Sequence, residues 1–118
     1  MATNIVDTAL TETFTVEAQD ELIVTQSGSI NVNLSAAIYN RIDTAVSVQV
    51  DGQVQGWFGI AFNSDPYAIV GPEERSQINI GETGRVNGQV GIDVFQMIAT
   101  DVRVEGTVTG VLGGIRMA

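Results

Sequence analysis

The sequence predicts an all-β fold, and more narrowly a single parallel β-solenoid (β-helix), on two observations. Thirteen glycines, only two prolines and many β-branched residues in 118 positions are typical of short strands separated by turns, and helical periodicity is nearly absent. In addition, a pattern of strands around a turn glycine recurs four times, with 24, 32 and 22 residues between successive turn glycines. Repeats of this length indicate coils that stack on one another.

Four segments align when their turn glycines are placed in one column. They span residues 22–39, 46–62, 78–94 and 102–117. The turn glycines are Gly28, Gly52, Gly84 and Gly106. The aliphatic residues two positions later are Ile30, Val54, Val86 and Val108, and the isoleucines that close each copy are Ile38, Ile60, Ile92 and Ile115. Each column should form a ladder of equivalent residues in neighbouring coils.

We expect about four to five coils in a right-handed solenoid, with three short strands in each coil. Alternation along the strands predicts that Val48, Val54 and Phe58 point inward, and that Gln53 and Trp57 point outward. Glycine suits the corners because positive φ is cheap for it and because it has no Cβ to block the adjacent coil. An antiparallel sandwich would also have short alternating strands, but it has no reason to repeat the identity of its corner residues.

The pattern divides the chain into two parts. Residues 1–21 are expected to form an N-terminal arm, a partial coil or a cap, and residues 22–118 the solenoid. The copy of 32 residues carries an insertion at residues 63–76, which contains both prolines. This composition predicts a loop that projects from the stack of coils.

Composition argues against several classes of function. Fourteen acidic and five basic residues give a net charge of −9, which disfavours nucleic-acid and membrane-surface partners. No stretch approaches the roughly 18 apolar residues of a membrane helix. The first residues lack the basic and apolar regions of a signal peptide. We expect an extracellular or cell-surface protein that is exported by a route that does not read an N-terminal signal, with the cytoplasm as the alternative.

The sequence contains no recognisable arrangement of catalytic residues, so we expect a non-catalytic protein without cofactor or metal. The chain has neither cysteine nor histidine, and its outward rows hold no pair of carboxylates arranged for glycoside hydrolysis. Asp51, Glu82 and Glu105 lie at or near the turn glycines of successive coils, where a cation could bridge them. Solvated corner residues are the simpler interpretation. Asp93 and Arg116 should face each other across adjacent coils as an ion pair that favours the correct register.

Trp57 is the candidate contact residue, because alternation places its indole on the outside where its column equivalents are Asn33, Gln89 and Val111. An exposed aromatic ring can stack on a sugar or anchor a partner. The alternative is that the inserted loop, with Tyr67, covers the ring.

The aligned segments resemble known repeats. "INIGETGRVNGQV" and "VRVEGTVTG" resemble the right-handed β-helix repeats of bacterial haemolysin-like and adhesin-like secreted proteins, and more weakly those of bactofilins, which form polymers. The resemblance covers about residues 22–117 and transfers no functional residues. The calcium-binding glycine- and aspartate-rich repeats that often accompany the secreted family are absent from the sequence.

The leading functional hypothesis is a structural protein whose protomers assemble end to end into a filament or oligomer. Ile115 and Met117 occupy core positions in the last repeat, with no capping sequence after them, and an unpaired end of stacked strands invites a partner. One alternative is a carbohydrate- or protein-binding module that uses Trp57 and the loop at residues 63–76. Another is a fragment of a larger secreted adhesin.

Overall fold

The structure is a computed structural model that describes residues 2–17, 20–40, 45–63, 75–95 and 99–117. Every regular element in these ranges is a β-strand. The strands are β1 (Thr3–Val6), β2 (Ala9–Leu10), β3 (Phe14–Thr15), β4 (Glu21–Val24), β5 (Ser29–Asn31), β6 (Ile38–Asn40), β7 (Ser47–Val50), β8 (Gln53–Gln55), β9 (Phe58–Asn63), β10 (Arg75–Ile80), β11 (Arg85–Phe95), β12 (Ala99–Val104) and β13 (Thr107–Met117). The prediction of an all-β chain is confirmed for the described residues.

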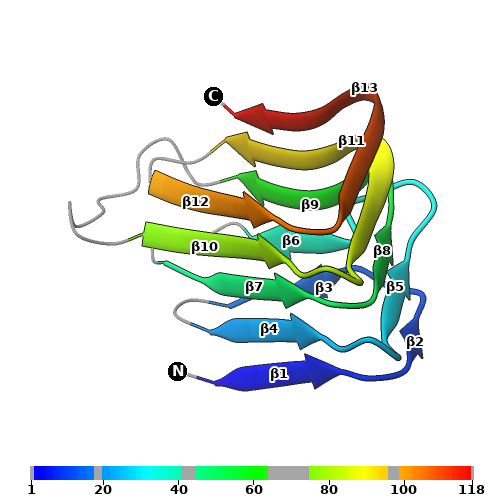
Figure 1. The fold of residues 1–118 in the computed structure, drawn as a ribbon, viewed down its shortest axis with the longest axis vertical. Helices are drawn as coiled ribbons and strands as arrows, with labels where there is room; N and C mark the ends of the chain where they lie inside the picture. Colours follow the sequence, from blue (N-terminus) through cyan, green and yellow to red (C-terminus); the bar gives the residue numbers. More distant parts are fainter. Residues whose placement is uncertain (1, 18–19, 41–44, 64–74, 96–98, 118) are drawn as a thin grey trace.

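The strands form two sheets in which every pairing is parallel. The first has five strands in the order β1-β4-β7-β10-β12, and the second has eight, in the order β2-β5-β8-β11-β9-β6-β3 with β13 beside β11. The chain passes from the first sheet into the second five times, and each pass lies beside the previous one (Figure 1). Figure 1 also shows that β11 and β13 bend sharply, so the larger sheet curves around the core.

The predicted fold class, a solenoid of four to five coils with three short strands each, is wrong. The structure has two parallel sheets of five and eight strands. The physical reason lies in β11 and β13, which run without a break through the position where the prediction placed a corner. Each of them joins the expected second and third strands of its copy, so both belong to one sheet. The register shifts between Gly88 and Val90, and such an irregularity allows a strand to bend. The radius of gyration is 12.8 Å, close to the roughly 13 Å expected of a compact domain of about 100 residues.

Alternation of side chains builds the core between the sheets. In β7 and β10 every second residue is fully buried, and Val48, Val50, Ile78 and Ile80 all point inward. Val54 is buried between exposed Gln53 and Gln55 in β8, as the sequence predicts. Phe58, which we expected in the core, is only half-buried.

The residue columns read from the sequence are confirmed as strand register. Ile30 pairs with Val54, Val54 with Val86, and Val86 with Val108. The closing isoleucines pair in the same way, from Ile38 through Ile60 and Ile92 to Ile115. The repeated sequence therefore specifies which residues meet, although it did not give the correct grouping of the strands into sheets.

Two polar residues are buried in the core. Asn40 is in register with Phe62, and its Nδ2 donates a hydrogen bond to the Val16 carbonyl at 2.8 Å. Ser76 accepts a hydrogen bond from the Val46 amide at 3.2 Å through its hydroxyl oxygen. Both side chains satisfy backbone groups of a neighbouring pass, which keeps their burial from being costly.

The two segments outside the regular repeat differ in how much of them is described. Residues 2–17 contribute β1, β2 and β3, which lie at one edge of the two sheets. In the insertion at residues 63–76, Asn63 ends β9, and Arg75 and Ser76 begin β10. Residues 64–74 lie outside the described part of the chain, and Tyr67 is among them.

Candidate functional site

A groove lies on the outside of the molecule, where the larger sheet bends. Its volume is about 600 Å³, and its walls come from the bend of four successive passes of the chain. The side chains that define it are Trp57, Asn33, Gln55, Asn87, Gln89 and Thr109. Gln55, Asn87 and Thr109 are direct neighbours in register, and the Thr109 hydroxyl donates a hydrogen bond to Oδ1 of Asn87. The groove therefore runs across the strands rather than along them.

Trp57 has a fixed backbone and an exposed ring. Its amide donates to the Ser35 carbonyl at 3.0 Å, and its carbonyl accepts from the Gln89 amide at 2.8 Å. The side chain nevertheless remains 44% exposed and lines the groove. The outward position predicted for Trp57 is confirmed. The predicted cover by Tyr67 falls on a residue outside the described ranges.

A second candidate surface is the edge formed by β12 and β13. Within the described chain, β12 pairs only with β10 and β13 only with β11, so the other side of each strand is open. This edge also exposes large apolar residues: Leu112 is 73% exposed and Ile115 is 46% exposed. The backbone of Met117 pairs with Val94, whereas its side chain lies outside the described part. The edge is thus both apolar and rich in unpaired backbone groups.

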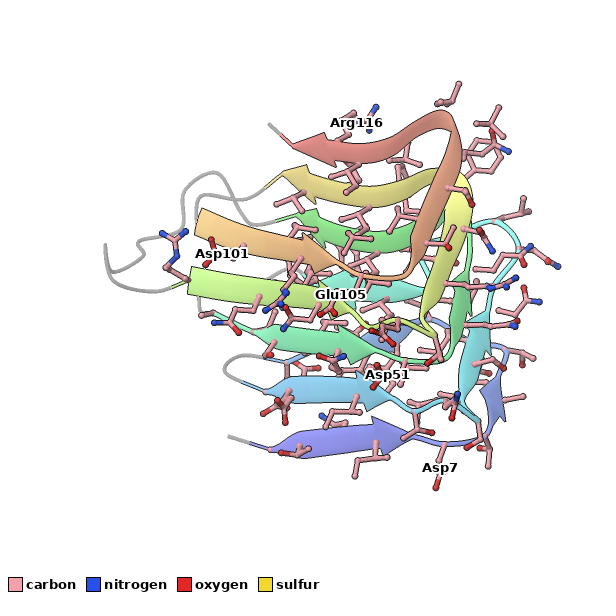
Figure 2. All side chains as sticks on the ribbon, viewed as in Figure 1. Asp7, Asp51, Asp101, Glu105 and Arg116 are labelled. Carbon is pink, nitrogen blue, oxygen red and sulfur yellow. The ribbon has the colours of Figure 1, made fainter. Side chains whose placement is uncertain are left out.

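The three carboxylates that a cation could have bridged, Asp51, Glu82 and Glu105, do not form one column. Asp7, Asp51 and Glu105 follow the last residues of equivalent strands and lie along the same corner (Figure 2). Thr25 and Gly81 occupy the same position in the passes between them. Neighbouring acids are therefore about two strand spacings apart, close to 10 Å, and Glu82 lies outside the column. Among the described residues, no group of three or more acidic, histidine or cysteine side chains could hold a metal ion.

A chelator should therefore leave thermal stability unchanged. Carboxylates this far apart cannot share one cation, because calcium needs its oxygen ligands within about 2.6 Å. The measurement is the melting temperature by calorimetry with EDTA and with added calcium chloride. A rise of several degrees with millimolar calcium, reversed by EDTA, would contradict this expectation.

Two ion pairs link neighbouring strands on the outer surface. The expected pairing of Asp93 with Arg116 is confirmed by two contacts of 3.1 Å. The pair between Arg75 and Asp101 was not predicted from the sequence, and its two hydrogen bonds measure 2.9 and 2.6 Å. The hydrogen bond from Arg75 holds the pKa of Asp101 below its usual value. Arg75, Asp101 and Arg116 are more than half exposed and only Asp93 is partly buried, so both pairs favour the register of the strands more than they add stability.

The amides around Trp57 are visible in the aligned sequence. The aligned columns already placed Asn33 and Gln89 beside Trp57, and Gln55 beside Asn87, but only the structure shows that the bend of the sheet hollows this surface. Within the described ranges, no helix has the length and apolar character needed to cross a membrane.

The chain matches no protein-family model, no curated protein and no solved structure.

Proposed function

We propose that this is a structural protein whose copies associate end to end through the open edges of the two sheets. The observation that carries the proposal is the apolar, unpaired edge formed by β12 and β13. Exposed sheet edges are ready templates for pairing with another chain. The occupant that fits this edge best is a second copy of the same chain, for the two reasons that follow.

The first reason is the match between the apolar columns at the two ends. Most of the inward columns that reach the β12 and β13 edge begin at the opposite edge with apolar residues. The residues that would meet are Val104 and Val6, Val108 and Leu10, and Ile115 and Phe14. Asn4 is a polar exception, since it stands in the column that contains Leu22 and Val102. A copy added at the strand spacing would thus continue most of the core.

The second reason is backbone geometry. β1, β2 and β3 each pair on one side only within the described chain, and they present the opposite edge to that of β12 and β13. Because all strands are parallel, a copy displaced along the stacking direction extends both sheets with the same hydrogen-bond pattern. Such a contact joins unlike surfaces and leaves an open edge on every new copy, which produces a filament rather than a closed dimer.

Wild-type protein should therefore form larger particles as concentration and salt increase. The net charge of −9 repels neighbouring copies, and salt screens that repulsion over about 10 Å at 0.1 M. Ile115→Lys should reduce association at least tenfold, because it places a charge in the contact. Sedimentation velocity across a salt series measures this effect. The matched control for charge is Gln53→Lys, because Gln53 is exposed but belongs to β8, which lies inside the sheet and away from its open edge.

A mixing experiment tests the head-to-tail arrangement. Ile115→Lys blocks one end, and Phe14→Lys blocks the other, so neither variant should form filaments alone. An equimolar mixture should form dimers and stop there, because only one pair of intact ends remains. Circular dichroism verifies that both variants are folded. A wild-type chain that stays monomeric at high concentration and high salt would contradict the proposed function.

A further inference from the structure

The groove beside Trp57 has the properties of a ligand site, and self-association does not account for it. Its volume of about 600 Å³ is within the usual range of 300 to 1,000 Å³ for small-molecule sites. It extends across several passes of the chain instead of lying at the β12 and β13 edge alone. A groove of this form suits an extended ligand that crosses the strands.

The charge of the groove indicates the class of ligand. The whole chain carries a net charge of −9, yet none of the described residues that line the groove is charged. Four of the side chains are amides, namely Asn33, Gln55, Asn87 and Gln89. An amide both donates and accepts hydrogen bonds, as a sugar hydroxyl does, and it offers no counter-charge to a phosphate, sulfate or carboxylate. The lining thus matches a neutral ligand rich in hydroxyl groups.

Trp57 supplies the apolar part of such a site. The C–H face of a pyranose ring is apolar and can stack on an indole, which combines a large apolar surface with one N–H donor. Backbone hydrogen bonds fix the main chain of Trp57 on two sides, while the residue stays 44% exposed. The indole is therefore presented from a fixed point of the backbone, and the main chain at this position need not become ordered when a ligand binds.

Strand spacing gives the direction of the ligand. Gln55, Asn87 and Thr109 follow one another at the spacing of neighbouring strands, about 4.8 Å, which is close to the length of one sugar unit in an extended glycan. We propose that the groove binds a neutral, extended polysaccharide, with Trp57 stacking on one sugar and the amides contacting the hydroxyls of its neighbours.

The single tryptophan of the chain makes the site directly observable. Cellohexaose, laminarihexaose and maltohexaose are the neutral probes, and hexagalacturonate is the anionic control. At least one neutral hexasaccharide should shift the fluorescence of Trp57 in a saturable way, and hexagalacturonate should not. Protein at a concentration where it sediments as a monomer separates this result from self-association.

Substitutions then assign the binding to the groove. By isothermal titration calorimetry, Trp57→Ala should weaken the affinity at least tenfold, Trp57→Phe should weaken it less, and Asn87→Ala should weaken it severalfold. Ile5→Ala is the control, because Ile5 is also an exposed apolar residue but lies in β1. The proposal is overturned if no neutral probe binds at millimolar concentration, if hexagalacturonate binds as tightly, or if Trp57→Ala binds like the wild type.

Discussion

Val86→Asp is expected to lower the free energy of unfolding by about 3 to 5 kcal/mol, the largest effect of any substitution considered. Val86 is fully buried in β11, with Val54 on one side and Val108 on the other. An aspartate there would have to bury either a charge without a partner or a protonated carboxyl group. Because a domain of this size has about 5 to 15 kcal/mol of stability in total, this loss is a large fraction of it, and the urea midpoint of the variant should fall accordingly.

The pH dependence of this variant provides a second measurement. Burial would raise the pKa of the new carboxyl group in the folded state above its ordinary value of about 3.9. The unfolded state then loses its proton first as the pH rises, so the deficit relative to wild type should be larger at pH 7 than at pH 4. Urea denaturation at the two pH values measures both deficits.

The control for Val86→Asp is Gln53→Asp. Gln53 is exposed in β8, directly beside Arg85 in register, so an aspartate there remains solvated and gains a nearby positive charge. Its effect should stay within about 0.5 kcal/mol. Equal losses of stability in the two variants would show that the inward and outward faces have been assigned incorrectly.

The register of the strands could be predicted from sequence because the repeated residues meet their own equivalents. Val54, Val86 and Val108 share a column in the alignment and a ladder in the structure. The same logic correctly paired Asp93 with Arg116. A column of identical or similar side chains is a direct record of parallel, in-register pairing, since each residue packs against the same residue type in the next pass.

The arrangement of the sheets could not be predicted, because it depends on whether the backbone continues through a glycine. Gly56 stands between β8 and β9, which are separate strands, whereas its equivalents Gly88 and Gly110 lie within β11 and β13. In the alignment, these three glycines occupy the same column. The difference concerns backbone pairing, which leaves no mark on a pattern of side chains.

The groove was missed for a related reason. Sequence columns placed amides around Trp57 but could not show that the surface is concave there. The buried Asn40 was also unexpected, because its position in the column belongs to Phe62 and Val94 in later passes. Its hydrogen bond to the Val16 carbonyl depends on a segment outside the aligned copies.

Gly84→Ala is the second substitution with a large expected effect, at least about 2 kcal/mol of lost stability. A Cβ at Gly84 would collide with the carbonyl oxygen of Val50 in the neighbouring pass. That oxygen already accepts the Gly81 amide at 2.8 Å, so it cannot move away without weakening a hydrogen bond at the corner. Of the two reasons given for corner glycines, close approach therefore holds and positive φ does not, because none of the described glycines has a left-handed φ.

Gly113→Ala is the matched control for this argument, since it makes the same chemical change at a glycine inside β13, away from the corner that contains Gly84. A Cβ at Gly113 would meet no atom within 4 Å. Because alanine has less conformational freedom than glycine in the unfolded chain, the substitution should be neutral or should stabilise the protein by up to about 1 kcal/mol. Thermal melts of the two variants give the comparison. If both variants melt near the wild-type temperature, the neighbouring passes are farther apart at the corner than the contact between Gly84 and Val50 requires. The turn glycines would then need another explanation.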